Sequence, residues 1–332
     1  MAENRLLEAV EIRKSFVSNA RLFSKKRHVV RAVDGVSLAV GRGETLGLVG
    51  ESGCGKSTLG NCLMRIVAAD AGRVEIMGPD GVRADFLALR GQALGRYRRM
   101  MQMVFQDPYS SINPRMTVKD VVGEPLLLGG VCRRGAEYDE RVAELMRIVG
   151  LSPEQMERYP HAFSGGQRQR VGIARALSTS PAFILCDEAV SALDVSVKAQ
   201  ILNLFMELQD RFHFSYLFIS HDLSVVRHIS SRVAIMYLGR IVEEGDIEDI
   251  FGGALHPYTA LLLSAVPNPD PDGARLRGTV REDVGQADRT GGCSFFPRCR
   301  RALPACRDAV PALTAVSATH KVACFFPEEE SK

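Results

Sequence analysis

The residues with the clearest chemistry occupy positions 50–57, where the sequence reads Gly-Glu-Ser-Gly-Cys-Gly-Lys-Ser. Their spacing fits the pattern G-x-x-x-x-G-K-[ST], in which glycines let successive backbone N–H groups face one anion. A helix that begins directly after such a loop adds the positive end of its dipole. Lys56 then suits the β- and γ-phosphates of a nucleotide, and Ser57 suits Mg²⁺. The pattern predicts a phosphate-binding loop rather than a plain glycine-rich turn.

Two carboxylates follow an apolar run farther along the chain. Residues 182–186 show no polar alternation, which is typical of a strand buried on both faces of a parallel sheet, and Asp187 and Glu188 come next. Ligands of such sheets bind at the carboxyl ends of the strands. One carboxylate could hold Mg²⁺ and the other could polarise an attacking water. Such a pair alone is usually a solvated turn, but the phosphate-binding loop favours the catalytic interpretation.

The elements that must position these residues alternate between strands and helices. Their periodicity predicts an α/β core with antiparallel strands at its front and a closing hairpin. The expected strands span 7–12, 29–40, 44–49, 73–77, 182–186 and 216–220, the helices 57–67, 167–177 and 195–212, and the hairpin 233–243. From residue 253 onward, the density of proline favours an extended linker. We therefore expect a nucleotide-binding domain over 1–252 and a C-terminal extension over 253–332.

Length and composition exclude several classes of protein. The 332 residues, 46% hydrophobic and 24% charged, are typical of a globular protein of about two domains. A net charge of +3 is too small to indicate nucleic-acid binding by bulk charge. Glu3, Arg5 and Glu8 stand where a signal peptide would need apolar residues, so we expect the chain to be unsecreted. The longest apolar stretch, 261–266, is far shorter than the roughly 20 residues that span a bilayer.

A second glycine-rich motif identifies a family. Residues 163–170, Phe-Ser-Gly-Gly-Gln-Arg-Gln-Arg, resemble the signature motif of ABC transporter ATPases, and physically they open a helix whose N-terminus is another anion-binding end. The resemblance implies an ABC-type P-loop nucleotide-binding domain, with a RecA-like parallel-sheet core, an antiparallel β subdomain and a helical subdomain. It also implies a head-to-tail dimer, in which the phosphate loop of one subunit and the signature of the other close on one ATP.

The same resemblance implies a role for each matching residue. Glu188 is the residue that polarises the hydrolytic water, Asp187 is a Mg²⁺ carboxylate, and His221 is the switch histidine near the γ-phosphate. Gln106 is the Q-loop glutamine, which senses Mg²⁺ and links the nucleotide to the membrane partner. The residues expected to contact ATP are Gly50, Ser52, Gly53, Cys54, Gly55, Lys56, Ser57, Thr58 at the α-phosphate, Ser164, Gly165, Gly166, Gln167 and, in the D-loop, Asp194.

Three positions match the family pattern less closely. Phe16 resembles the aromatic residue that stacks on adenine, although a core aromatic is an equal alternative there. The signature opens with Phe163 where leucine is commoner in the superfamily. Ala189 follows Glu188 where proline is usual, and we expect a less rigid turn because proline would fix φ. Neither departure removes a polar catalytic group.

Other stretches point to one branch of the family. Residues 105–118, 159–161 and 256–259 resemble the ATP-binding subunits of dipeptide and oligopeptide importers, of the type that pairs with a second, non-identical ATPase. The resemblance implies two ATPases at the cytoplasmic face of the membrane under two permeases, fed by an extracytoplasmic peptide-binding protein, with no nucleic acid. The alternatives are an importer of nickel chelates or other small solutes, a soluble ABC ATPase, and an iron–sulfur redox protein with a nucleotide switch.

Four cysteines crowd the end of the chain: Cys293, Cys299, Cys306 and Cys324. Four thiolates suit either tetrahedral Zn²⁺ or an iron–sulfur cluster. Their spacing lacks the C-x₂-C pairs of zinc modules, and the family resemblance favours a 4Fe-4S cluster with a structural or redox-sensing role. A disulfide is the alternative, although disulfides are rare in the reducing cytosol, where a chain that binds ATP belongs.

Overall fold

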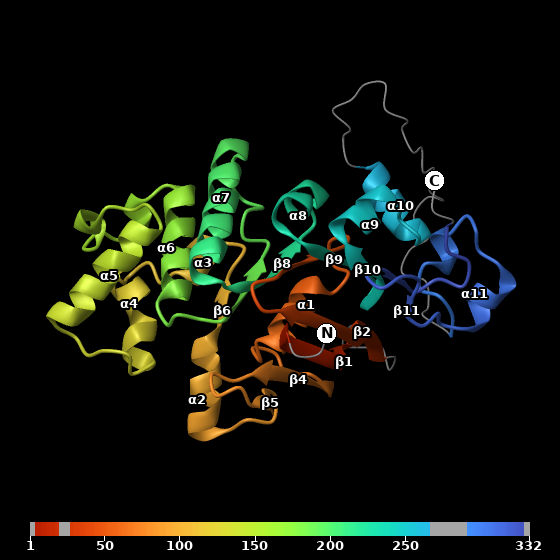
Figure 1. Cartoon of the computed structure of the whole chain (residues 1–332), viewed down its shortest axis with the longest axis horizontal. Helices are drawn as coiled ribbons and strands as arrows, with labels where there is room; N and C mark the ends of the chain where they lie inside the picture. The colour runs from red at the N-terminus through yellow and green to blue at the C-terminus, as the bar shows by residue number, and fades with distance from the viewer. Residues whose placement is uncertain (1–3, 20–26, 266–290, 329–332) are drawn as a thin grey trace.

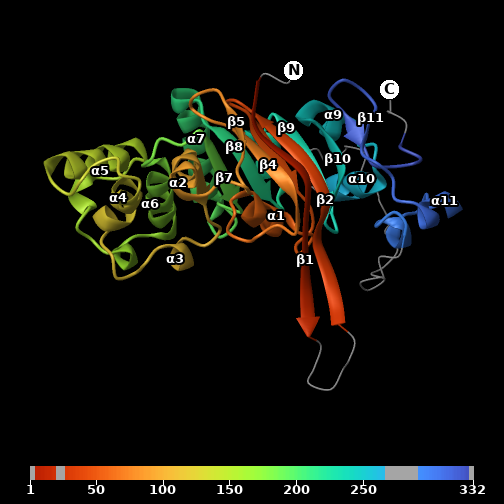
Figure 2. The same cartoon turned by 90° about the horizontal axis from the view of Figure 1, so that it is seen from below.

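The computed structural model describes residues 4–19, 27–265 and 291–328. Its first sheet is antiparallel, with strand order β2-β1-β4-β5. The strands are β1 (Arg5–Asn19), β2 (Arg27–Gly41), β4 (Ala71–Met77) and β5 (Arg83–Asp85). Leu7, Ala9 and Ile12 of β1 are buried against this sheet's core. β1 and β2 run beyond the expected strands because they pair with each other as a hairpin that projects from the molecule (Figure 2).

The second sheet carries the predicted parallel core. Within the described residues its order is β11-β12-β10-β9-β3-β8-β7-β6. The parallel strands are β3 (Thr45–Val49), β6 (Met101–Val104), β7 (Phe183–Asp187), β8 (Ser215–Ser220) and β9 (Arg232–Tyr237). Every side chain of β3, β7 and β8 is buried, which explains the missing polar alternation. The expectation of parallel strands at 182–186 and 216–220 is confirmed.

Helices pack around this sheet and form a separate group at one end (Figure 1). Those beside the sheet are α1 (Lys56–Leu63), α2 (Gly91–Met100), α7 (Val195–Phe212) and α8 (Leu223–Ile229). The end group consists of α3 (Pro108–Ser111), which packs on α6, together with α4 (Val118–Leu128), α5 (Ala136–Ile148) and α6 (Gly165–Leu177). Its buried faces, which include Val122, Tyr138 and Val171, share one apolar cluster with β7 and β8. Across the described ranges, each helix is too short or too polar to cross a membrane.

The chain after residue 253 does not form the expected extended linker throughout. β10 (Arg240–Asp246) and α9 (Ile247–Gly252) lead to α10 (Pro257–Ser264). Proline is tolerated at the first position of a helix because its missing N–H has no partner there, and His256 Nδ1 caps α10 by accepting from the Tyr258 N–H (3.0 Å). Pro267, Pro269 and Pro271 lie outside the described residues.

The last described segment, residues 291–328, adds to the core sheet. It contains the short helices η4 (Phe296–Arg298) and α11 (Pro304–Asp308) and the strands β11 (Thr314–Ala315) and β12 (Lys321–Val322). β12 pairs antiparallel with β10. Figure 1 places α11 and β11 at the end of the molecule opposite to α5. This segment is therefore joined to the core sheet by backbone hydrogen bonds.

Glu243 of β10 fixes this junction from within. Its buried carboxylate accepts from the backbone N–H groups of Leu255 (2.7 Å) and His256 (3.0 Å), and it lies 2.8 Å from His320 Nε2. A buried charge is stable only when it is paired or hydrogen-bonded. The three contacts join β10, the start of α10 and the segment before β12 at one side chain.

Removing this carboxylate should destabilise the fold. Glu243→Ala leaves two buried backbone N–H groups without acceptors, and we expect a loss of about 3 kcal/mol in the free energy of unfolding, measured by urea denaturation. Glu248→Ala, at an exposed position in α9, serves as the control and should cost less than about 1 kcal/mol. Equal losses in the two variants would contradict the role of Glu243.

His256 should make stability depend on pH. Burial lowers the pKa of His256 to about 4, although the neighbouring Glu243 carboxylate opposes the shift. The unfolded histidine has a pKa of about 6.5, so between these values the unfolded chain binds one more proton and stability falls as the pH falls. Between pH 7 and pH 5, we expect His256 to account for a loss of about 2 kcal/mol in unfolding free energy. His256→Asn keeps an N-cap acceptor and should lose less over this range; identical slopes would show that His256 is not responsible.

Candidate functional site

The predicted phosphate loop connects β3 to α1. Gly53 and Gly55 adopt φ values of +77° and +111°, which strain any residue with a side chain. A Cβ at Gly50 would come within 2.1 Å of the Met236 carbonyl oxygen, and one at Gly55 within 2.0 Å of the Ala32 carbonyl oxygen. Glycine is therefore required at these positions because the loop is wedged between β2 and β9.

Lys56 lies inside this loop. Its buried Nζ donates to the carbonyl oxygens of Gly50 (2.7 Å) and Glu51 (3.0 Å). The loop thus curls around a cation at the N-terminus of α1, where the helix dipole adds positive potential. Burial raises the pKa of the Cys54 thiol, so this side chain brings no negative charge to the loop. The arrangement fits the phosphates of a nucleotide.

Ser57 and Asp187 form the side of the site that suits Mg²⁺. The Ser57 hydroxyl donates to Asp187 Oδ1 (2.9 Å), which joins the first turn of α1 to the end of β7. Burial raises the pKa of Asp187, and the Ser57 hydrogen bond partly offsets this effect. A hydroxyl and a carboxylate are oxygen donors of the kind that Mg²⁺ prefers. The donor set therefore fits the expected ion.

Three side chains predicted to act in hydrolysis meet at the carboxyl edge of the sheet. Gln106 follows β6, Glu188 follows β7 and His221 follows β8. Gln106 Nε2 donates to Glu188 Oε2 (3.1 Å), and His221 Nδ1 lies 3.2 Å from the same oxygen. Because parallel strands end at the same edge, residues 82 positions apart come into contact here.

The backbone at Glu188 is held by hydrogen bonds. Its φ of +48° lies in the left-handed region, which is costly for a residue with a side chain. Its N–H donates to the Ile219 carbonyl (3.0 Å), and its carbonyl accepts from the N–H (3.0 Å) and hydroxyl (2.9 Å) of Ser191. Ala189, next in the chain, is buried. These bonds restrain the turn in which proline is usual after the glutamate.

The predicted signature lies in the helical group, at the N-terminus of α6. Ser164 Oγ accepts from the Gln167 N–H (3.3 Å), and Gln167 Oε1 accepts from the Ser164 N–H (3.0 Å), so the two form a capping box. A Cβ at Gly166 would come within 2.5 Å of Val197 Cγ1 in α7, whereas one at Gly165 would have room. Asp194 is the N-cap residue of α7. Ser164 and Gln167 thus satisfy each other's hydrogen bonds at the start of α6.

Phe16 lies on the projecting β1–β2 hairpin. Its side chain is 45% exposed, and Lys14 Nζ lies 5.5 Å from the centre of its ring. The alternative that Phe16 is a core aromatic is therefore wrong. Stacking on adenine stays a prediction.

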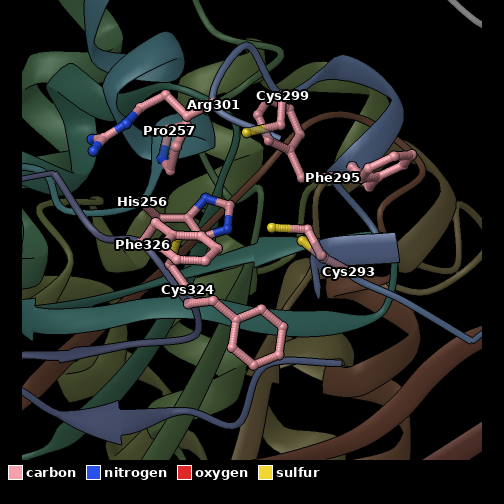
Figure 3. A pocket seen from close by; sticks show the side chains of 11 residues that line it. His256, Pro257, Cys293, Phe295, Cys299, Arg301, Cys324 and Phe326 are labelled. Carbon is pink, nitrogen blue, oxygen red and sulfur yellow. The ribbon is translucent and has the colours of Figure 1, made fainter. Parts of the chain in front are cut away.

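The expected 4Fe-4S cluster is not supported, and neither is zinc. Cys293, Cys299, Cys306 and Cys324 line one cavity together with Phe295, Phe296, Phe325, Phe326, His256, Pro257 and Arg301 (Figure 3). Nevertheless, among residues 4–19, 27–265 and 291–328, His, Cys, Asp and Glu side chains form no group of three or more that could hold a metal ion. The iron–sulfur expectation is therefore wrong, because the spacing of the cysteines alone does not create a set of metal ligands.

Two residues that contact the phosphate loop were missed by sequence reasoning. Tyr258 Oη accepts from the Glu51 N–H (3.0 Å), and Arg298 makes two bonds to the Glu51 carboxylate (2.9 and 3.0 Å). Tyr258 belongs to the His-Pro-Tyr-Thr stretch that resembles the importers, which was a usable signal. Arg298 stands 247 positions from Glu51, and its surroundings in the sequence give no such signal.

Comparisons with known proteins agree with this geometry. Residues 33–191 match the family model for ABC transporters, and residues 242–306 match the oligopeptide/dipeptide transporter C-terminal region. A probable peptide ABC transporter ATP-binding protein of Sinorhizobium fredii is 49% identical over 320 residues, covering 96% of this chain and 89% of the relative. The oligopeptide transport ATP-binding protein AppF of Bacillus subtilis is 44% identical over 330 residues, covering 97% of each.

Solved structures share the fold as well. A dimeric bacterial ABC transporter cassette superposes with a TM-score of 0.61 at 27% identity, covering 73% of this chain and 99% of the cassette. The residues matched by the ABC transporter model include the phosphate loop and the carboxylates at the end of β7, and the second model covers the start of the C-terminal region. The chain therefore belongs to the family of ATP-binding proteins of peptide ABC transporters.

Proposed function

We propose that this chain is the ATP-hydrolysing subunit of an ABC importer and that it powers the uptake of di- and oligopeptides. The observation that best supports this proposal is that Gln106 and His221 both contact Glu188. They do so at the edge of the sheet where Ser57 meets Asp187. This edge combines a cationic phosphate loop with a positioned carboxylate, which are the parts that phosphoryl transfer to water requires. The peptide-transporter relatives supply the cargo class.

The roles of the residues follow from their contacts. Lys56 and the loop N–H groups bind the phosphates of ATP, and Ser57 and Asp187 hold Mg²⁺, which neutralises charge on the phosphates when it is bound. Glu188 makes both of its side-chain contacts through Oε2. Among the described residues, no side-chain donor is bonded to Oε1, which can accept from the attacking water. Gln106 and His221 keep the carboxylate in that orientation.

Further nucleotide contacts come from this chain's signature, which faces the partner's ATP, and from Thr58 and Phe16 at its own ATP. Ser164, Gly165, Gly166 and Gln167 open α6 in the helical group, so one chain carries two helix N-termini that suit anions. We place this signature, with Asp194, against the ATP bound by a second, non-identical ATPase, whose own signature completes the site at Lys56. Thr58, in the first turn of α1, contacts the α-phosphate, and Phe16 stacks on adenine.

The assembly follows from the family. Membrane permeases are the partners of a peptide-importer ATPase, and we propose two of them, with this chain peripheral on the cytoplasmic face and a peptide-binding protein on the other side. The chain contacts the permeases rather than the peptide. We further propose that residues 1–252 are the nucleotide-binding domain and that residues 253–332 form an extension typical of peptide importers.

Replacing the glutamate should separate binding from hydrolysis. In the transporter purified with its neighbouring subunits, Glu188→Gln should retain ATP binding but lower ATP turnover at least about 100-fold, because an amide cannot accept a proton from water. The variant should accumulate a closed, ATP-bound dimer, measured as retained nucleotide after gel filtration. Glu207→Gln, at an exposed position in α7, is the control and should keep normal turnover. Persistent turnover in Glu188→Gln would place hydrolysis at the partner's site.

Gly165 tests whether the signature acts on the partner's nucleotide. Gly165→Asp has room for its Cβ but brings a negative charge toward phosphates, and we expect ATP turnover of the assembled transporter to fall at least tenfold. Gly165→Ala is the matched control and should stay within about twofold of the wild type. The isolated full-length Gly165→Asp chain should bind ATP normally. Loss of binding in the isolated chain would show that the signature acts within its own subunit.

A further inference from the structure

Glu51 is an acidic residue inside the phosphate loop, and the C-terminal extension holds it. Arg298 of η4 donates from both terminal nitrogens to the two carboxylate oxygens of Glu51, at 2.9 and 3.0 Å. The Glu51 N–H donates to Tyr258 Oη in α10, and its carbonyl accepts from Lys56 Nζ. Three residues therefore bind the side chain or the backbone of Glu51, and two of them, Tyr258 and Arg298, lie beyond residue 252.

An aromatic cluster lies beside Arg298. Tyr237 at the end of β9, Tyr258 and Phe295 have ring centres 4.5–5.5 Å apart. The Arg298 guanidinium lies 5.8 Å from the ring centres of both Tyr237 and Phe295. These rings belong to a buried cluster that also contains Val49, the last residue of β3 before the loop. Arg298 is therefore held on a packed surface that is continuous with the strand leading into the phosphate loop.

The charges explain why this pairing concerns the nucleotide. A carboxylate in a phosphate-binding loop repels the phosphates, and its effect is strong over a few ångströms where water is partly excluded. The Glu51 side chain is 42% exposed and that of Arg298 only 19%. A two-bond arginine–carboxylate pair is geometrically specific and charge-assisted. Arg298 thus neutralises the one acidic side chain in residues 50–57 and fixes its direction.

We propose that Arg298 is a positioning residue for ATP, through which the C-terminal extension sets the affinity of the phosphate loop by neutralising and orienting Glu51. The inference rests on the proposed ATPase function and adds a residue outside the nucleotide-binding domain to its site. Arg298 acts through Glu51 and Tyr258 acts on the same residue, so the extension is part of the machinery that binds nucleotide.

The test is a titration of the full-length chain with Mg²⁺ and a non-hydrolysable ATP analogue. Arg298→Ala should weaken binding roughly three- to tenfold, because a partly exposed charge pair of this kind contributes up to about one factor of ten. The deficit should shrink at high salt, where the charge of Glu51 is screened. Adding Glu51→Gln to Arg298→Ala should restore most of the affinity, because the unpaired charge is then removed. Arg298→Lys keeps the charge but not the two-bond geometry, and it should be intermediate.

Controls keep the outcomes distinct. Arg301→Ala removes a neighbouring arginine whose partner is Glu328 within the extension, and it should bind the analogue like the wild type. In the assembled transporter, Arg298→Ala should raise the KM for ATP more than it lowers kcat. If Arg298→Ala binds like the wild type, or the double variant stays as weak as Arg298→Ala while both remain folded, the inference is overturned. If the wild type itself does not bind the analogue, the proposed ATPase function fails instead.

Discussion

The site depends on the burial of the parallel strands on both faces. Strands such as β3, β7 and β8 are buried throughout, so polar groups can be presented to a ligand only where the strands end. The ends of these strands and the segments that follow them therefore carry Lys56, Asp187, Glu188 and His221, and the common edge of the sheet brings them together. Backbone strain at Glu188 is tolerated there because neighbouring hydrogen bonds hold the turn.

Two sets of contacts join the C-terminal extension to the sheet, one buried and one nearer the surface. Glu243, buried in β10, binds the start of α10 and lies against His320, which fixes the extension to the sheet. Nearer the surface, Arg298 and Tyr258 reach Glu51 in the phosphate loop. The first connection determines where the extension lies, and the second carries its influence to the nucleotide. Stability and affinity are thus set by different carboxylates.

The sequence predicts the parts of the fold that depend on patterns of neighbouring residues along the chain. Uninterrupted apolar runs predict β7 and β8, and Gln106, Glu188 and His221 meet because the strands before them end at one edge. Helix α10 is not predicted because a high density of proline favours extended chain, although Pro257 stands at the tolerated first position. The contact of Arg298 with Glu51 spans 247 positions and has no local pattern. Cysteine spacing is a poor guide here because it carries no information on whether the thiols come together as a group of metal ligands.

We propose that each ATP is bound between the phosphate loop of one subunit and the signature of the other. Hydrogen–deuterium exchange of the assembled transporter, with and without Mg²⁺ and a non-hydrolysable ATP analogue, is the most direct test of this shared site. We expect the backbone amides of residues 50–58 and of residues 164–170 in this chain to become protected together. Protection confined to residues 50–58, with exchange at 164–170 unchanged at saturating nucleotide, would contradict the shared site.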